Sequence, residues 1–258
     1  MDTTPKKPIP QEAAPYEILA AGYDLVMSHV DYEEWAIYIH QVLMKHRPEN
    51  VETVIELGCG TGLFAIELQP LADYTMAGID KAPNMIRFAK ERAEWEGIPV
   101  QFEVADFTDF KLDQCVDAMI LLQDGLNYLL HTDAILRLFS CVYNGLKAGG
   151  LFVFDLSTPH NSINNAAYFD DEDEEGGFHY IRKSHYEPIS RIHTTQFTLN
   201  FQQQTYYETH IQQAYTFEEI HQLIQQTPFM FLAAYHDTSL KPANSESERI
   251  HWVLQKPA

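Results

Sequence analysis

Three glycines stand within five residues of one another in the segment VIELGCGTGLFA, which covers 54–65. Apolar residues precede them as in a buried strand, and apolar residues at helical spacing follow them, so the segment predicts a strand, a tight turn and a helix. Glycine tolerates positive φ and lets a ligand approach the backbone, and the first N–H groups of a helix favour anionic or electron-rich groups. The segment is compatible with a nucleotide-type site and also with a turn that serves packing alone.

Polar side chains stand at the ends of four further predicted strands. The first, Asp80, lies about 20 residues past the glycines, where the ribose hydroxyls of a bound nucleoside are usually held. A helix-capping acid is the alternative for this residue. Because the carboxyl ends of parallel strands meet at one edge of a sheet, the four side chains predict a ligand crevice there. The four are Asp80 at the end of 74–80, Asp106 after 100–104, Gln123 after 115–122 and Asp155 near the end of 151–156.

From the glycine loop onward, strand and helix alternate five times. Pro83 opens a helix that runs to Trp95, and a further helix over 132–146 is stopped by Gly149 and Gly150. The run at 115–122 is almost wholly apolar, which is typical of a strand buried on both faces. The alternation predicts a parallel sheet covered by helices.

The pattern changes after the fifth strand. A solvated acidic turn is predicted at 170–177, and apolar and polar residues then alternate over 178–216 without helical spacing. This alternation predicts two or three antiparallel strands inserted after the fifth strand. Thr216, with Glu219 in the capping-box position, begins a helix that runs to about residue 226. The two closing strands are predicted at 229–235 and 249–254.

The domain organisation follows from these elements. Residues 1–15 are rich in Pro, Thr and Lys and lack an apolar stretch, so they predict a flexible tail. Residues 16–258 are predicted to form a single domain. Within it, 16–48 form an N-terminal helical cap and 160–215 hold the inserted strands.

The cap is predicted to contain two helices, over 16–29 and 32–46. Tyr16 and Tyr23 are about two helical turns apart and could therefore face the same side. Such tyrosines could form walls of a ligand site, or they could only pack the cap against the edge of the sheet.

Charge and cysteine content restrict the possible partners. The 258-residue chain has 17 basic and 37 acidic side chains, a formal net charge of −20, which disfavours nucleic acid as a partner. Cys59, Cys115 and Cys141 are scattered rather than arranged as metal-ligand or redox pairs, so reduced and mostly buried thiols are expected and no metal is predicted. We find no signal peptide and no apolar run long enough to span a membrane, and we expect a cytoplasmic protein.

The ordered motifs resemble one family. The glycine loop, Asp80, the Asp106-Phe107 pair, the LLQDGLNYL segment and the LKAGGLFVFDL strand look like the class I, seven-stranded S-adenosylmethionine-dependent methyltransferases, over about residues 16–252. The YDLVM element at Tyr23, the triplet that starts at Asn127 and the inserted strands are similar to small bacterial methyltransferases, including those that methylate amino groups of nucleotide-linked sugars. The resemblance implies an α/β fold, a Rossmann-like doubly wound sheet of seven mostly parallel strands. Its last strand is antiparallel, and a small antiparallel β insertion follows strand 5.

The resemblance also implies roles for individual residues, with S-adenosyl-L-methionine as the cofactor. The glycines would shape the loop beneath the methionine portion, Asp80 would hold both ribose hydroxyls, and Asp106 with the Phe107 backbone would contact the adenine edge. Gln123 would lie beneath the methionine end, whereas Met85 would pack on the adenine face or be an ordinary core methionine. The predicted cofactor-binding residues are Tyr16, Gly58, Cys59 by its backbone only, Gly60, Gly62, Asp80, Lys81, Met85, Asp106, Phe107 and Gln123.

The chemistry of methyl transfer needs few special groups. A sulfonium methyl is already electrophilic, so the enzyme mainly aligns a nucleophile, an orientation effect of roughly 7 to 11 kcal/mol at best. Aromatic rings such as those of Tyr16 and Tyr23 would add cation–π attraction on the order of 1 kcal/mol. An amine acceptor must lose a proton, and the predicted catalytic residues are Tyr23, Asn127 and Asp155, which the sequence does not rank.

The sequence therefore predicts methyl transfer to the nitrogen or oxygen of a small molecule, by a monomer or homodimer. A nucleotide-binding Rossmann-type oxidoreductase is one alternative, although the loop is G-x-G-x-G rather than G-x-G-x-x-G. A non-catalytic S-adenosylmethionine-binding protein is the other. Nucleic acid is disfavoured as the acceptor by the acidity of the chain and by the absence of an Asn/Asp-Pro-Pro-Tyr type segment after the fourth strand. The identity of the acceptor stays open.

Overall fold

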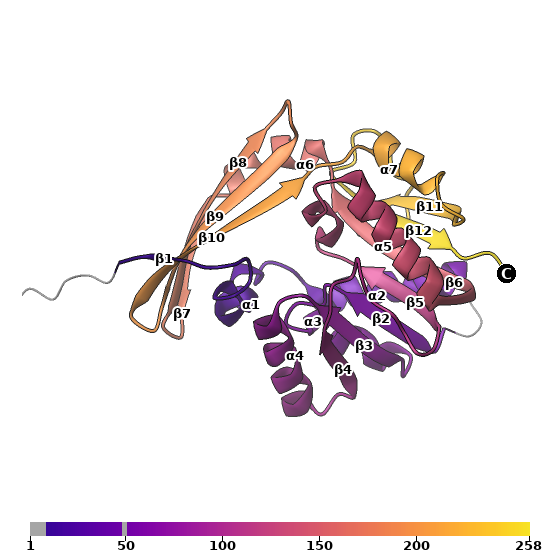
Figure 1. Cartoon of the computed structure of the whole chain (residues 1–258), viewed down its shortest axis with the longest axis horizontal. Coiled ribbons are helices and arrows are strands. Elements are labelled where there is room, and N and C mark those ends of the chain that lie inside the picture. The colour runs from indigo at the N-terminus through magenta and orange to yellow at the C-terminus, as the bar shows by residue number, and fades with distance from the viewer. Residues whose placement is uncertain (1–8, 48–50) are drawn as a thin grey trace, which may run out of the picture.

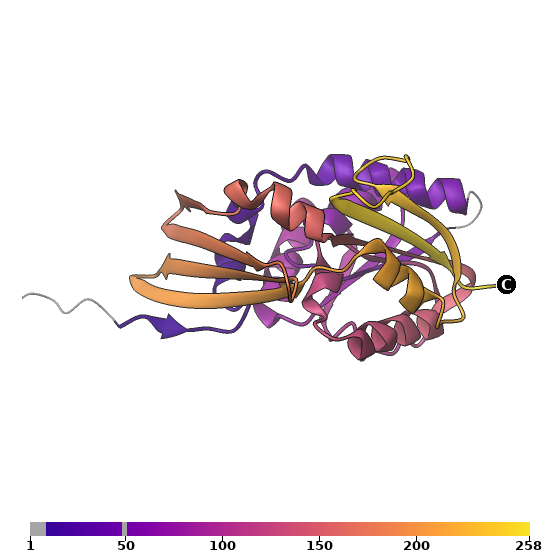
Figure 2. The same cartoon turned by 90° about the horizontal axis from the view of Figure 1, so that it is seen from above.

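The computed structural model describes residues 9–47 and 51–258, and they form two β-sheets (Figure 1). The larger sheet has seven strands in the order β11-β12-β6-β5-β2-β3-β4, and the smaller has five in the order β1-β10-β9-β8-β7. Seen from above, the smaller sheet extends away from one end of the larger one (Figure 2). None of the helices in the described part of the chain is long and apolar enough to cross a membrane.

The seven-stranded sheet is the predicted doubly wound sheet. The five strands from β6 to the edge strand β4 pair in parallel, β12 pairs antiparallel with β6, and β11 pairs antiparallel with β12. The middle strand β5 is wholly apolar and buried apart from its first residues, as expected of a strand covered on both faces. The strands are β2 (Thr53–Leu57), β3 (Thr75–Asp80), β4 (Val100–Val104), β5 (Val116–Leu121), β6 (Leu146–Ser157), β11 (Met230–His236) and β12 (Arg249–Gln255).

Helices cover both faces of this sheet. Three of them share one buried cluster with the sheet, and the other two share a second buried cluster on the opposite face. The capping box predicted at Thr216 is present, because its side chain accepts from the Glu219 N–H and the Glu219 carboxylate accepts from the Thr216 N–H. The first face carries α2 (Tyr32–His46), α3 (Leu63–Leu68) and α4 (Pro83–Glu96), and the second carries α5 (Thr132–Gly145) and α7 (Phe217–Ile224).

The inserted segment forms a larger sheet than predicted. Three long antiparallel strands confirm the predicted insertion, but the acidic segment expected to be a turn forms a further strand at its edge, and its carboxylates pair with Arg182 and Lys183. The short helix α6 (Pro159–Asn164) joins this sheet to β6. Its strands are β7 (Asp171–Glu175), β8 (Phe178–Glu187), β9 (Ile192–Phe201), β10 (Gln204–Gln213) and β1 (Gln11–Glu12).

The N-terminal predictions need correction. Residues 1–8 of the predicted tail lie outside the described residues, but Gln11 and Glu12 form β1, which pairs in parallel with β10. The helix predicted over 16–29 is instead a 3₁₀ helix, Leu19–Gly22, followed by the single turn α1, Tyr23–Val26. A buried carboxylate of the second sheet, Glu208 on β10, accepts from backbone N–H groups of this segment, and the segment packs closely on that sheet. A Cβ added at Gly22 would lie 2.1 Å from the Phe178 ring.

Two smaller predictions also fail. Gly149 and Gly150 are predicted to stop a helix, but they lie within β6. The helix α5 ends earlier, at Gly145, where an added Cβ would lie 2.5 Å from Met119 Cε. The thiols are not mostly buried, because Cys59 is buried whereas Cys115 is exposed.

Candidate active site

The glycine loop joins β2 to α3, and all three of its glycines have positive φ, at 66° for Gly58, 53° for Gly60 and 80° for Gly62. Gly58 and Gly60 line a cavity of about 470 Å³ at the carboxyl ends of the strands. Gly62 does not line it. A Cβ added there would lie 2.7 Å from the Phe102 ring, so Gly62 is needed for packing where α3 begins, and its role in cofactor binding stays a prediction.

The predicted cofactor-binding residues converge on this cavity except for two. Besides Gly62, the exception is Cys59, whose side chain is buried in the core cluster beneath α3 and whose N–H donates to the Ile79 carbonyl. Cys59 lines only a small separate cavity. The residues that line the large cavity as predicted are Tyr16, Gly58, Gly60, Asp80, Lys81, Met85, Asp106, Phe107 and Gln123.

Two carboxylates at neighbouring strand ends are held in fixed orientations. Asp80 accepts from the N–H of Gly60 at 3.0 Å and from the N–H of Ala82 at 2.8 Å, so it fixes the glycine loop and also the start of α4. Burial raises the pKa of Asp80. For Asp106, burial is outweighed by hydrogen bonds from Thr108 and by the Lys81 ammonium at 3.0 Å, which together lower the pKa.

Gln123 has an unusual environment. Its φ is 56°, a left-handed conformation that is uncommon for a residue with a side chain, and its Nε2 is buried without a hydrogen-bond partner in the described part of the chain. Buried amide donors are normally paired, and each unpaired one costs about 1 to 3 kcal/mol. The side chain lines the large cavity and also a second cavity beside it, so the unpaired donor lies where the two cavities adjoin.

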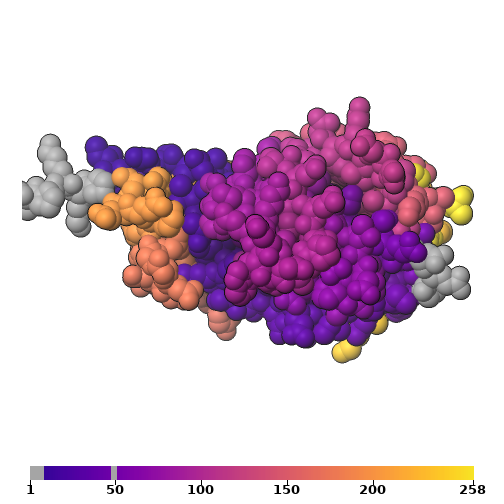
Figure 3. Space-filling view, turned by 90° about the horizontal axis from the view of Figure 1, so that it is seen from below, coloured from indigo at the N-terminus to yellow at the C-terminus, as the bar shows by residue number. Residues whose placement is uncertain are grey.

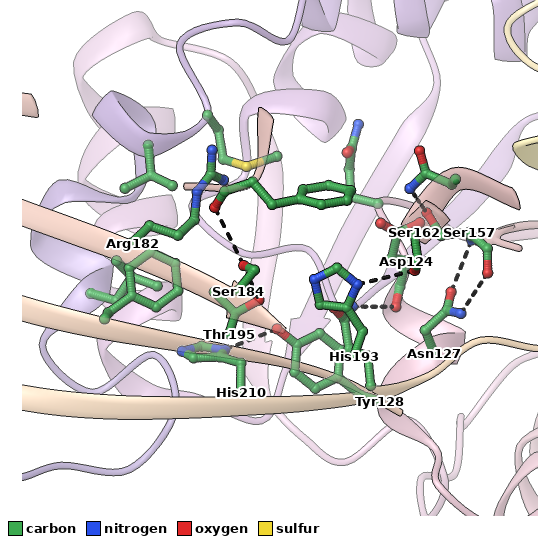
Figure 4. A pocket seen from close by; sticks show the side chains of 18 of the residues that line it. Asp124, Asn127, Tyr128, Ser157, Ser162, Arg182, Ser184, His193, Thr195 and His210 are labelled. Carbon is green, nitrogen blue, oxygen red and sulfur yellow. Dashed lines mark hydrogen bonds between the residues drawn. The ribbon is translucent and has the colours of Figure 1, made fainter. Parts of the chain in front are cut away.

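The second cavity, of about 170 Å³, lies between the five-stranded sheet and the ends of β5 and β6 (Figure 4). Its walls carry hydroxyl, amide and imidazole groups, among them Ser184 and Thr195, and burial lowers the pKa of His193, whose Nδ1 lies 3.0 Å from Ser162 Oγ. The charged side chains are already paired, as Arg182 binds Asp171 through two 2.7 Å bonds. The cavity therefore offers hydrogen-bonding groups and little net charge.

Four side chains line both cavities, namely Tyr16, Tyr23, Gln123 and Tyr128. We call these four residues the junction. The Tyr16 ring lies edge-on to the Tyr23 ring, with centroids 5.9 Å apart, and the Tyr16 and Tyr128 hydroxyls are 2.5 Å apart. The prediction that Tyr16 and Tyr23 face one side is confirmed, although no continuous helix brings them together.

The three predicted catalytic residues have different surroundings. Tyr23 lies at the junction, and burial raises its pKa well above the ordinary value. Asn127 is buried with its amide fully used, because it donates to the Ser157 and Gln213 carbonyls and accepts from the Ser157 N–H. Asp155 is fully buried and lines neither cavity.

Asp155 instead belongs to a buried ion cluster. Its carboxylate accepts from the Asp124 N–H and binds the Arg249 guanidinium, which also binds the Asp124 carboxylate at 2.7 Å. Burial is the main reason why the pKa of Asp155 is raised to about 6. These contacts hold Asp124 and β12 in place, and a catalytic role for Asp155 stays a prediction.

Sequence reasoning missed a buried carboxylate that fastens the N-terminal segment over the site. Glu208 on β10 is fully buried and accepts from the N–H groups of Tyr16 at 2.7 Å, Ile18 at 2.6 Å and Leu19 at 2.9 Å. In this way Glu208 holds Tyr16 at its positive φ of 65°. Seen from below, the N-terminal segment lies between the second sheet and the part of the chain around residues 60–110 (Figure 3).

Comparison with known proteins agrees with this geometry. Residues 54–150 match a family model described as a methyltransferase domain. A protein of Geobacillus sp. (strain WCH70) named as a methyltransferase is 27% identical over 250 residues, which cover 93% of this chain and 99% of that relative. An S-adenosylmethionine-dependent methyltransferase from Clostridium acetobutylicum ATCC 824 matches with a TM-score of 0.78 at 20% identity, over 94% of this chain and 99% of that one. An amino pentose methyltransferase from Micromonospora echinaspora, solved with S-adenosylmethionine bound, matches with a TM-score of 0.68 at 17% identity, over 91% and 96% of the two chains.

The fold, the glycine loop and these matches define the class. Residues 54–150 match a methyltransferase domain, as the motifs predict, and the chain is similar over most of its length to a protein named as a methyltransferase. These matches identify an enzyme of methyl transfer with S-adenosylmethionine as its cofactor. The oxidoreductase alternative is therefore dropped. The likeness to the solved structures, at 20% identity and below, is a likeness of fold alone.

Proposed function

We propose that the enzyme transfers the methyl group of S-adenosylmethionine to a nitrogen or oxygen atom of a small, polar acceptor bound in the second cavity. The observation that carries this proposal is the meeting of two cavities at four shared residues. One cavity has glycine backbone, two oriented carboxylates and apolar walls, and the other has hydroxyl and amide walls between two sheets. Transfer requires the donor and the acceptor atoms to be held in line, which two adjoining cavities permit.

The residues of the first cavity fit the cofactor. Its volume lies in the usual range for cofactor sites, and a Cβ added at Gly60 would meet only the Tyr23 ring, at 3.6 Å. When bound, S-adenosylmethionine supplies an electrophilic methyl group. Asp80 would hold the ribose hydroxyls, Asp106 and Phe107 would contact the adenine, and Met85 would pack against it. The free Nε2 donor of Gln123 would bind a polar group of the ligand at the junction.

Tyr16 and Tyr23 would stabilise the positive charge of the sulfonium, and the segment that carries them would keep water from it. Tyr16 and Tyr23 present ring surface where the sulfonium would lie, which favours it by on the order of 1 kcal/mol. Glu208 anchors the N-terminal segment that carries both rings to the second sheet, and this segment would shield the bound cofactor from water. Excluding water strengthens the electrostatic contacts within the site.

The acceptor class follows from the second cavity. Its charged groups are internally paired and its free groups are neutral donors and acceptors, which suits a small polar molecule better than a strongly charged one. The fold likeness to an enzyme named for an amino pentose supports a sugar-like acceptor. The cytoplasmic location, the single domain and the monomeric or dimeric state stay predictions.

Calorimetry tests the proposal. We expect S-adenosylhomocysteine to bind the full-length protein with micromolar-range affinity, and Asp80→Asn to weaken that binding by at least 10-fold. The matched control, Asp113→Asn, changes an exposed acid away from both cavities and should bind as the unchanged protein does. Methyl transfer is then measured with radiolabelled S-adenosylmethionine and a panel of amino and hydroxyl sugars. Absence of S-adenosylhomocysteine binding would reject the cofactor site, and binding without transfer to any acceptor would favour the non-catalytic alternative.

A further inference from the structure

Four side chains from three parts of the chain form one line of hydrogen bonds. Glu208 Oε2 lies 3.3 Å from His210 Nε2. His210 Nδ1 lies 2.9 Å from the Tyr128 hydroxyl (Figure 4). The Tyr128 hydroxyl lies 2.5 Å from the Tyr16 hydroxyl. Glu208 and His210 are buried on the inward face of β10, and the two tyrosines belong to the junction.

The donors and acceptors available at each residue determine which group donates in each bond of this line. Both oxygens of Glu208 already accept from backbone N–H groups, so we assign the contact with His210 as a bond that His210 donates through Nε2–H. A neutral imidazole protonated at Nε2 accepts at Nδ1, so the Tyr128 hydroxyl donates to Nδ1. Tyr128 oxygen can then accept from the Tyr16 hydroxyl. Each donor therefore points away from the junction and toward the buried Glu208–His210 pair.

The Tyr16 hydroxyl, at the outer end of the line, can accept a further hydrogen bond. Once Tyr16 donates to Tyr128, the lone pairs of its oxygen are available at the point where the two cavities meet. Glu208, at the inner end of the line, also binds the Tyr16 backbone N–H. Glu208 therefore fixes both the position of the Tyr16 hydroxyl and the ring nitrogen of His210 that donates.

We propose that Tyr16 takes the proton that the acceptor must lose, and that Tyr128, His210 and Glu208 carry it away from the reacting atoms. This inference rests on the proposed function and deepens it. The acceptor lone pair forms the new bond to the methyl carbon, and the electrons of the carbon–sulfur bond stay on sulfur. The acceptor proton passes to Tyr16 oxygen, the Tyr16 proton to Tyr128, and the Tyr128 proton to His210 Nδ1. His210 becomes an imidazolium beside the Glu208 carboxylate. After the product leaves, this proton returns through Tyr128 and Tyr16 to water in the emptied cavities, and His210 is neutral again.

The proposal defines the acceptor more narrowly. Its reacting atom carries a removable proton, as in a primary or secondary amine or a hydroxyl, and is not a tertiary amine or a thioether. Burial raises the pKa of both Tyr16 and Tyr128, so neither hydroxyl holds a negative charge and both only pass a proton on. The other titratable groups that face the two tyrosines are Tyr23, Asp80 and Asp124.

The first experiment needs no acceptor. The full-length protein is labelled with ¹⁵N-histidine, and long-range proton–nitrogen spectra report which ring nitrogen of His210 carries the proton, with His210→Gln assigning the signal. We expect a neutral ring with the proton on Nε2, and a shift of the Nδ1 signal toward a free acceptor in Tyr128→Phe. A proton on Nδ1 would reverse the line and overturn the proposal.

The second experiment measures turnover after S-adenosylhomocysteine binding has been shown, so that failure of the cofactor site is recognised separately. His210 lines the acceptor cavity but not the cofactor cavity, so His210→Gln should keep S-adenosylhomocysteine affinity within about 2-fold. With an amine or hydroxyl acceptor from the panel, kcat should fall on the order of 100-fold and lose its acidic limb in the pH profile.

The matched control is His179→Gln, a histidine of the same sheet whose ring binds Asn200 and lines neither cavity. It should keep the pH profile. If His210→Gln is unstable, Tyr128→Phe interrupts the same line while keeping the ring, and the same loss of the acidic limb is expected. A kcat within 3-fold of the unchanged enzyme together with an unchanged pH profile, in either variant that folds, would overturn the proposal.

Discussion

Two glycines of one loop should respond to the same substitution in opposite ways. At Gly62, a Cβ would lie 2.7 Å from Phe102 and 3.0 Å from Ala89, at a φ of 80°. The left-handed conformation costs roughly 1 to 2 kcal/mol for an alanine, and overpacking costs about 1 to 3 kcal/mol. Gly62→Ala should therefore lower the free energy of unfolding by roughly 2 to 5 kcal/mol, a large share of the stability of a typical domain.

At Gly60, a Cβ would meet only the Tyr23 ring, at 3.6 Å, so it would project into the cofactor cavity. Gly60→Ala should cost only the backbone term, roughly 1 to 2 kcal/mol, but should weaken S-adenosylhomocysteine binding by 10-fold or more. Urea unfolding measures the first quantity and calorimetry at 15 °C the second. The reasoning is refuted if Gly62→Ala is as stable as the unchanged protein, or if it loses more ligand affinity than Gly60→Ala.

Two further predictions concern the buried ion cluster and its neighbour. Arg249→Met removes the counter-ion of the fully buried Asp155 and should lower the free energy of unfolding by about 3 kcal/mol, whereas Arg87→Met, in an exposed pair, should change it by less than about 0.5 kcal/mol. Equal effects in urea unfolding would contradict the burial argument. Burial lowers the pKa of His251 from 6.5 to about 3, so the folded state binds fewer protons than the unfolded state between these values and stability is lost as pH falls. From pH 7 to pH 5 this loss is about 2 kcal/mol, and it should be absent in His251→Gln but present in His29→Gln, which changes an exposed histidine. An identical pH dependence in all three proteins would show that His251 titrates normally.

The parts of the fold that could be predicted depend on local pattern. The central strands follow from apolar runs, and the helix at Thr216 follows from a capping box only four residues long. Asp80 and Asp106 were found because the ends of parallel strands meet at one edge whatever the rest of the chain does. These features need no knowledge of distant contacts.

The features that could not be predicted depend on distant contacts. The segment after Tyr16 has a helical stripe, but Glu208, which lies 192 residues away from Tyr16, takes its backbone donors and a continuous helix does not form. In the sequence, Gly62 has the spacing of a ligand-binding glycine. Only the fold shows that the Phe102 ring occupies the space beside it.

The buried face of β10 could not be predicted for a different reason. Its outward face carries Tyr207 and Ile211, which are 38% and 42% exposed, while Glu208 and His210 point inward and are buried. Alternation normally places the apolar side chains inside, so the usual rule selects the wrong face here. A charged residue and a histidine two positions apart in a predicted strand are the only signal that the inward face has a polar role.

The position of the cofactor sulfur is the most direct test of the proposed function. A crystal structure of the full-length protein with S-adenosylhomocysteine should place the ribose at Asp80, the adenine between Met85 and Phe107, and the sulfur at the junction of Tyr16, Tyr23, Gln123 and Tyr128. The second cavity should open beside the sulfur, with Gln123 Nε2 bonded to the ligand. A sulfur atom that lies away from the junction, or that is separated from the second cavity by packed side chains, would contradict the account.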